Sequence, residues 1–257
     1  MDIDREKYYL TDLVDLHSHL LANDLVLEYL TGDEIVINGN NYSADEIVSL
    51  KILESEFKLS VKDFAHLFVV FNKSRVLMQL ENPRGRDWAP EGYYVKTINH
   101  ELIAQQHKNN IGIFLEEADS YGIAIDALHI DSFNLKEDAP SLLGTIGFCL
   151  CALVAYLNGF SRIDLVGAGR NSPKDKNIGY FVWPKLGFDS ALDLIDRSSW
   201  PQEYLGFRTI QDIVKIDEKF WEDNGGQLLM SFDLSPGSVS WKKLLDYTRR
   251  KLLWSTE

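Results

Sequence analysis

The sequence of 257 residues lacks any long hydrophobic run. Its most apolar window, Ile146 to Leu157, has the length of a core helix and falls short of the roughly 18 apolar residues typical of a membrane span. The first ten residues, MDIDREKYYL, carry charges throughout, which argues against a secretory signal. We therefore expect a cytoplasmic protein that does not cross a membrane.

Cysteine is nearly absent. The two that occur, Cys149 and Cys151, are two positions apart in a stretch that we expect to be helical, so their side chains point to different sides of the helix. They cannot easily bond to each other. Buried free thiols suit a reducing compartment, in agreement with a cytoplasmic location.

The nucleotide-binding and hydrolase motifs with a known mechanism are missing. There is no Walker sequence and no Gly-x-Ser-x-Gly, and the segment Val166 to Gly169 lacks the spacing of a dinucleotide fingerprint. His17 and His19 have no accompanying cysteine or histidine pair at ligand spacing. We therefore expect no NAD, no ATP and no metal.

Positive charge is scarce. The 26 Lys and Arg residues face 39 Asp and Glu residues, which leaves a net charge of −13 and a pI near 4.9. Such a charge repels phosphate backbones and anionic lipid surfaces, so nucleic acid and membranes are not expected partners. The basic clusters are small: Arg84 with Arg86, and Arg249 to Lys251, which we interpret as the cationic last turn of a helix.

Apolar residues are plentiful, and they predict a folded protein of mixed α and β structure. They make up 45% of the chain, enough to bury a substantial core as one large domain or two. In the first part we expect an amphipathic helix over about 9–30, broken at Asn23, and then a strand that runs into the Asn-Gly turn of EIVINGNNYS. Ser43 to Glu46 is a capping box that predicts a helix to about Ser55, and residues 66–80 suggest a hairpin.

The segment NPRGRDWAPEG contains two prolines and two glycines and is the clearest loop in the chain. We interpret it as a lid or a boundary, between an N-terminal α/β region of unknown role (1–90) and a second domain (91–257). In the second domain we expect a strand that starts at residue 92, a short helix over 111–122, a strand over 124–133, and an apolar helix that ends near residue 159. A strand at 161–169, a helix within 204–221, a strand at 227–235 and a final helix capped by Ser238 or Ser240 follow.

Residues 124 to 189 carry the most informative pattern. A strand (AIDALHIDSF) leads to a small-residue turn (APSLLGTIG), an apolar helix (FCLCALVAYLNG), a second strand (SRIDLVGAG) and a segment that closes on WPKLGFD. This order resembles the coenzyme A-binding half of the GNAT N-acetyltransferases. The resemblance implies a GNAT-like core with an N-terminal extension, built on a mixed, partly antiparallel sheet flanked by helices.

The resemblance also implies a cofactor site. Leu143, Gly144, Thr145, Ile146 and Gly147 stand where the family holds the coenzyme A pyrophosphate on the backbone N–H groups of a helix N-terminus. Two positions depart from the family pattern, since Ser141 replaces a Gln or Arg and Ile146 replaces a small residue. The alternative is that Gly144 and Gly147 only permit a tight turn between strand and helix.

A catalytic acid and a base complete the expected site. Trp183 stands where the family has its acidic tyrosine, and indole cannot donate a proton as an acid, so Tyr180 is the substitute, helped by disruption of the helix at Pro184. Alternation along the strand places His129 and Asp131 on one face, where they would act as the base. The runners-up for the base are Glu116 and Glu117 on a solvated helix face. The alternative for Tyr180 is that it is an aromatic residue packed beside Phe181. The alternative for His129 is that it is a half-buried, hydrogen-bonded histidine.

Two functions are therefore open. In the first, the protein is an acyltransferase that moves an acetyl group from acetyl-CoA to an amine of a small molecule or a protein. In the second, it is an inactive acyltransferase-like scaffold, an acidic protein that neutralises or regulates a basic protein partner. The altered residues Ser141, Ile146 and Trp183 favour the second function.

Overall fold

A computed structural model describes residues 3–52, 55–81, 92–104, 108–118, 122–169 and 177–253. The chain forms two compact units, Met1–Ser161 and Arg162–Glu257. The boundary expected near residue 90 falls inside the first unit, between two strands that pair with each other. The loop proposed as a lid lies outside the described residues, apart from its last glycine.

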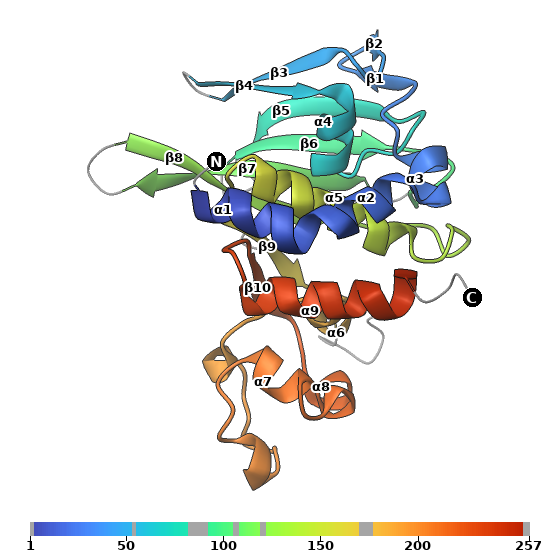
Figure 1. Ribbon diagram of the computed structural model, residues 1–257. Helices are drawn as coiled ribbons and strands as arrows, with labels where there is room; N and C mark the ends of the chain where they lie inside the picture. Colours follow the sequence, from blue (N-terminus) through green and yellow to red (C-terminus); the bar gives the residue numbers. More distant parts are fainter. Residues whose placement is uncertain are drawn as a thin grey trace. The chain divides into compact units, whose positions relative to one another are not determined.

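A mixed sheet forms one layer of the first unit (Figure 1). Its strands run in the order β8, β7, β6, β5, β1, β2. Strand β1 is parallel to β5, and the other pairs are antiparallel. The bounds are β1 (Ile35–Ile37), β2 (Asn40–Tyr42), β5 (Arg75–Glu81), β6 (Gly92–Ile98), β7 (Asn109–Ala118) and β8 (Gly122–Ser132). The expected fold class, mixed α/β with a partly antiparallel sheet flanked by helices, is confirmed.

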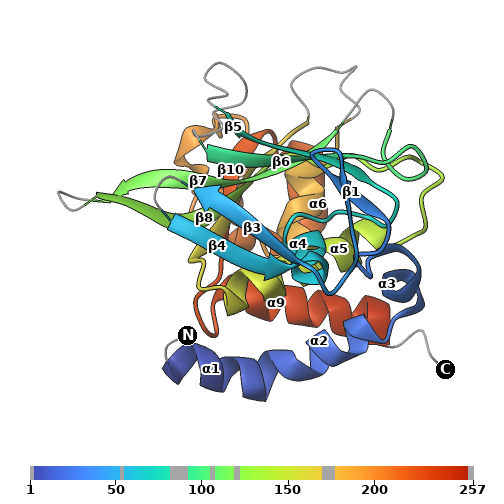
Figure 2. The ribbon, with the colours of Figure 1, turned by 90° about the horizontal axis from the view of Figure 1, so that it is seen from above.

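The helices of this unit lie on one side of its sheet (Figures 1 and 2). Seen from above, α4 and α5 lie between the sheet and the N-terminal helices, and α5 contacts both α2 and α4. A separate hairpin of β3 (Ile47–Ile52) and β4 (Ser55–Ser60) packs on α4. The helices are α1 (Ile3–Tyr8), the π-helical turn η1 (Tyr9–Leu13), α2 (Val14–Leu21), α3 (Asp24–Tyr29), α4 (Val61–Leu67) and α5 (Leu143–Leu157).

Helix α5 is the centre of the first unit because it is apolar on all sides. Twelve of its residues are buried. Cys149 and Cys151 are free and buried, and burial raises the pKa of both thiols. The Cys151 thiol donates to the carbonyl of Leu67 across a sulfur–oxygen distance of 3.0 Å. Both cysteines therefore act as small core residues.

Two local predictions in the first unit are confirmed. The N-terminal helical segment breaks before Asp24, where the Asn23 side chain accepts a hydrogen bond from the Leu25 N–H at 3.0 Å and caps α3. The Asn38-Gly39 turn joins β1 to β2, with φ values of 47° and 87°. Positive φ at both central positions is the geometry that hairpins favour.

Three other predictions were wrong. The contact between Ser43 and Glu46 is present, but a strand follows it, because Val48 and Leu50 are buried at the alternate positions of β3. Residues 66–80 hold the end of α4 and one strand rather than a hairpin, and the Ser60 side chain caps α4. Residues 111–122 belong mostly to β7, since pairing with β6 and β8 overrides local propensity.

The second unit has a two-stranded antiparallel ribbon and short helices around an aromatic core. Strand β9 (Arg162–Gly167) pairs with β10 (Leu228–Asp233). The rings of Phe188, Phe232 and Trp241 pack edge to face at 5.6 and 5.3 Å. The helices are α6 (Gly179–Lys185), η2 (Leu192–Leu194), η3 (Gln202–Tyr204), α7 (Ile210–Val214), α8 (Glu218–Asn224), α9 (Val239–Thr248) and the π-helical η4 (Arg249–Leu253).

The final helix begins as predicted. The Ser238 hydroxyl accepts a hydrogen bond from the Trp241 N–H at 3.2 Å, so Ser238 is the cap. Across the described parts of the chain, no helix has the length and apolar character needed to traverse a bilayer.

Candidate functional site

His129 lies in a packed part of the first unit. The register places Tyr94, Gly112 and His129 side by side on three neighbouring strands. A Cβ on Gly112 would lie 2.5 Å from the Tyr94 ring, so this ring covers the glycine, and it meets the His129 ring edge to face at 6.5 Å. His129 is 2% exposed. Its role as a base stays a prediction, but the imidazole occupies a packed position.

Asp131 is the extra residue of a β-bulge. Asn110 pairs with Ser132 and the next residue, Ile111, pairs with Ile130, which leaves Asp131 without a partner in the register. A bulge interrupts the strict alternation from which the His129/Asp131 pair was predicted. The half-buried carboxylate accepts a hydrogen bond from the Asn110 amide at 2.8 Å. The runners-up, Glu116 and Glu117, lie in β7 rather than on a helix, and their side chains are outside the described set.

The predicted cofactor segment forms the first turn of α5. Helix α5 follows Leu142, whose φ of 68° lies in the left-handed region. The Leu143 N–H donates to the Pro140 carbonyl at 3.2 Å, and the Ile146 N–H donates to Leu142 at 2.9 Å. The Leu143 and Ile146 side chains are buried, whereas Gly144 and Thr145 are half-buried. The bulky Ile146 therefore points into the protein core.

Both glycines of this turn are in close contact with neighbouring side chains. A Cβ on Gly147 would lie 2.6 Å from a methyl group of Val69, and one on Gly144 would lie 3.3 Å from Phe133 and Leu135. Gly147 thus lets the segment after α4 approach α5 closely. This contact provides a structural reason for the small residue, independent of any cofactor.

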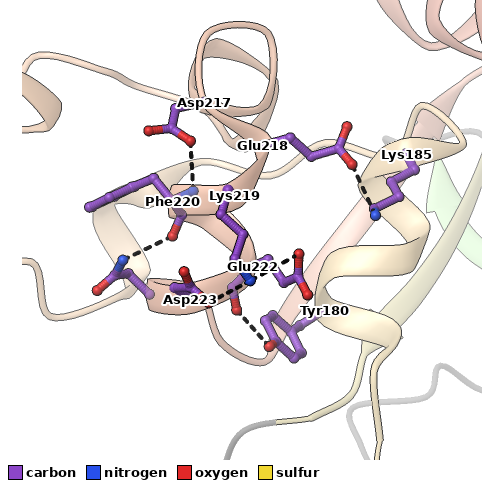
Figure 3. A network of polar contacts seen from close by, with 9 residues as sticks. Tyr180, Lys185, Asp217, Glu218, Lys219, Phe220, Glu222 and Asp223 are labelled. Atoms are coloured by element: carbon purple, nitrogen blue, oxygen red, sulfur yellow. Dashed lines mark hydrogen bonds and ion pairs between the residues drawn. The ribbon is translucent and has the colours of Figure 1, made fainter.

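Tyr180 lies in the second unit, with a hydroxyl that is already bonded. It is 8% exposed, and its hydroxyl donates to the Glu222 carbonyl at 2.8 Å (Figure 3). The expected disruption at Pro184 does not occur, because α6 continues through Trp183 and Pro184 to Lys185. Pro184 has no N–H for the Tyr180 carbonyl, and the Trp221 indole N–H donates to that carbonyl instead at 2.9 Å.

The expected site residues fall in both units, with His129, Asp131 and the α5 turn in the first and Tyr180 in the second. In comparisons with protein-family models, curated proteins and solved structures, nothing matched this chain. Within the described ranges, no group of three or more His, Cys, Asp or Glu side chains could hold a metal ion.

The charge of the protein is divided unequally between its units. Residues 1–161 contain 25 acidic and 12 basic residues, whereas residues 162–257 contain 14 of each. The whole excess of negative charge therefore belongs to the first unit. The division could be recognised only once the unit boundary was known.

The N-terminal helices carry a large share of this excess. Six of their carboxylates are exposed and define what we call the N-terminal acidic surface: Asp4, Glu6, Asp12, Asp15, Asp24 and Glu28. Lys7 is the one exposed lysine or arginine between residues 3 and 30. Three large apolar side chains, Ile3, Leu10 and Leu27, are 84%, 59% and 58% exposed among them.

Helix α1 belongs to this surface and has no buried residue. Arg5 of α1 donates to the carbonyls of Tyr156 and Phe160 at 3.0 and 2.7 Å, in the last turn of α5 and just after its end. The Arg5 guanidinium lies 4.4 Å from the Tyr156 ring centre, and the Tyr156 hydroxyl donates back to the Arg5 carbonyl at 2.8 Å. Together with the Tyr8 ring, which meets the Tyr156 ring edge to face at 6.1 Å, Arg5 attaches a helix that has no buried residue.

Proposed function

We propose that this protein acts by binding a basic segment of another protein through its N-terminal acidic surface. The observation that carries the proposal is the charge division, with an excess of 13 acidic residues in the first unit and none in the second. A concentrated negative field attracts and orients a Lys- and Arg-rich partner. This is the neutralising or regulatory role expected of an acyltransferase-like scaffold that does not catalyse.

The form of the surface supports recognition of a protein. Exposed apolar side chains among carboxylates offer contact area that a purely charged surface lacks. Because α1 buries no residue, its outward positions are not needed for the core. Arg5 nevertheless keeps the helix in place, so the surface is formed before a partner arrives.

A synthetic peptide of alternating Lys and Arg residues tests this proposal by fluorescence anisotropy at 20 and 200 mM NaCl. We expect binding at low salt that weakens about tenfold in the Glu6→Gln/Asp15→Asn variant, since each exposed charge pair contributes up to about 1 kcal/mol. The matched control, Asp193→Asn/Glu203→Gln, removes two exposed carboxylates from the second unit. Equal weakening in both variants, or no binding at low salt, would contradict the proposal.

The second candidate function is acetyl transfer from acetyl-CoA to an amine. The order of strand β8, helix α5 and strand β9 along the chain favours it. Under this alternative, the turn from Leu143 to Gly147 holds the cofactor, and His129, Asp131 and Tyr180 remain the proposed catalytic groups. A cytoplasmic location accompanies both candidates.

Thermal unfolding with acetyl-CoA, with coenzyme A and without ligand separates the two candidates. Transferase function requires a rise of several degrees that the Gly144→Glu variant loses. Because Gly144 is close to Phe133 and Leu135, the unliganded variant is measured first to establish that it folds. An unchanged midpoint at millimolar cofactor would leave the binding function alone.

A further inference from the structure

A cavity of about 400 Å³ lies in the second unit, and none of the residues predicted to be catalytic is among the described residues that line it. Four cationic side chains and a single carboxylate are among the described residues that line it: Lys185, Glu218, Lys243, Tyr247, Arg250 and Lys251. A cavity of this size suits a small molecule. Its charge is opposite in sign to that of the whole protein.

Three helices bring these residues together. Lys243, Tyr247 and Arg250 follow one another at spacings of four and three along α9 and η4, so they share one side of the helix. Lys185 is in the last turn of α6 and Glu218 is in the first turn of α8. Helix α6 contacts both α8 and α9.

The carboxylate that lines the cavity is already engaged. Glu218 forms an ion pair with Lys185 at 2.9 Å, and the two side chains point toward each other (Figure 3). The Asp246 carboxylate lies 4.0 Å from Arg249, outside the lining. The lining thus keeps an excess of positive charge around Lys243 and Arg250.

One contact orients Arg250 for an anion, and the cations of the lining repel one another. Arg250 Nε donates to the Asp246 carbonyl at 3.1 Å, which orients the guanidinium. Burial lowers the pKa of Lys243, and the positive charges of Arg250 and Lys185 act in the same direction, against Glu218 and Asp246. An anion bound in the cavity would offset the repulsion between Lys243 and the cations Arg250 and Lys185.

We propose that this cavity binds the phosphate group of a small phosphorylated molecule. A phosphate dianion offers several acceptor oxygens to the lysines, the arginine fork and the Tyr247 hydroxyl, whereas a carboxylate offers two. The volume exceeds that of a phosphate ion and leaves room for an organic group beside the Tyr247 ring. A polyanion such as RNA fits poorly, because the second unit, with 14 acidic and 14 basic residues, has no overall positive charge to attract it.

Calorimetric titration of the full chain with phenyl phosphate, benzoate and inorganic phosphate tests the site. We expect phenyl phosphate to bind at least about tenfold more tightly than either other probe, because it alone combines a phosphate with an organic group. The Lys243→Met/Arg250→Gln variant should lose about tenfold or more in affinity. The matched control is Lys242→Met/Arg249→Gln, which removes the same charges one position earlier on exposed side chains.

Glu218→Gln is a second variant, in which we expect the affinity for phenyl phosphate to increase. Releasing Lys185 from its ion pair should tighten phenyl phosphate binding about threefold or more. The proposal is overturned if the two double variants lose affinity equally, if benzoate binds as well as phenyl phosphate, or if neither wild type nor Glu218→Gln binds phenyl phosphate at millimolar concentration. Tighter binding of inorganic phosphate than of phenyl phosphate would make this a site for the free ion and would also overturn it.

Discussion

The carbonyl of Tyr180 is the group that Pro184 leaves without a helical donor, and the indole of Trp221 replaces that donor. The exchange lets a proline lie inside a seven-residue helix, because no buried acceptor is left unsatisfied. It also ties the backbone of Tyr180 to α8, while the Tyr180 hydroxyl binds the Glu222 carbonyl. Both polar ends of Tyr180 are therefore used to join α6 to α8.

His66 is the residue whose titration should affect stability most clearly. It is 1% exposed, and its Nε2 lies 2.8 Å from the Leu30 carbonyl oxygen. Because a carbonyl oxygen can only accept, Nε2 carries a hydrogen and donates it. Burial lowers its pKa from 6.5 to about 4, with the Leu30 hydrogen bond opposing the shift. The folded state therefore holds a neutral imidazole at pH values where the unfolded chain has already bound a proton.

We expect the free energy of unfolding to be highest above pH 6.5 and to fall as the pH drops toward about 4. Between these values the unfolded state binds more protons, so stability increases with pH, by about 3 kcal/mol over the window. Urea denaturation from pH 4 to pH 7 measures the slope. His66→Gln cannot gain a proton and should flatten it, and an unchanged slope in that variant would show that other groups dominate.

Helix α1 illustrates, at the scale of an element, how a surface helix can be held without a buried face. Arg5 donates to carbonyls in the last turn of α5 and just after its end, and the Tyr8 ring contacts Tyr156. The C-terminal end of a helix favours cations, so the guanidinium benefits from the dipole as well as from the hydrogen bonds. Arg5 therefore helps to position the part of the N-terminal acidic surface that α1 carries, Asp4 and Glu6.

Arg5→Met should detach α1 while leaving the rest of the unit folded. The variant loses two charge-assisted hydrogen bonds, for which we expect a decrease of about 2 kcal/mol in the free energy of unfolding. Hydrogen exchange of the α1 amides should become faster, whereas α5 should stay protected. Lys7→Met removes an exposed cation from the same helix and serves as the control. Comparable loss of protection in α1 from both variants would show that the Arg5 contacts are not the anchor.

The charge division matters at the scale of the whole molecule. The first unit has 25 acidic and 12 basic residues, so its carboxylates repel one another, whereas acidic and basic residues are equal in number in the second unit. Salt at about 0.1 M screens charges beyond about 10 Å. The ionic strength should therefore change the stability of the protein as well as its binding of basic peptides.

We expect NaCl to raise the midpoint of thermal unfolding between 20 and 200 mM, because screening relieves repulsion among the carboxylates of the first unit. Calorimetry at both salt concentrations measures the effect. The Glu6→Gln/Asp15→Asn variant should respond less to salt than the Asp193→Asn/Glu203→Gln control. A midpoint that falls with salt would mean that attractive pairs outweigh the excess negative charge.

Local signals in the sequence were enough for several elements and for the fold class. Asn23 and Ser238 cap the helices that follow them, Asn38-Gly39 makes a hairpin turn, and the run from Ile146 to Leu157 is a core helix. Each of these signals acts over a few residues through backbone hydrogen bonds or side-chain periodicity. The net charge and the absence of a long apolar run were also read without the structure.

Only the tertiary structure decided what depends on residues far apart in the chain. Residues 109–118 are a strand because β6 and β8 pair with them, and His129 is enclosed because Tyr94 fills the space over Gly112. Likewise, Lys185 meets the cations of α9 and η4 across more than fifty intervening residues. Such contacts arise when distant segments bury surface together, and no local pattern records which segments will meet.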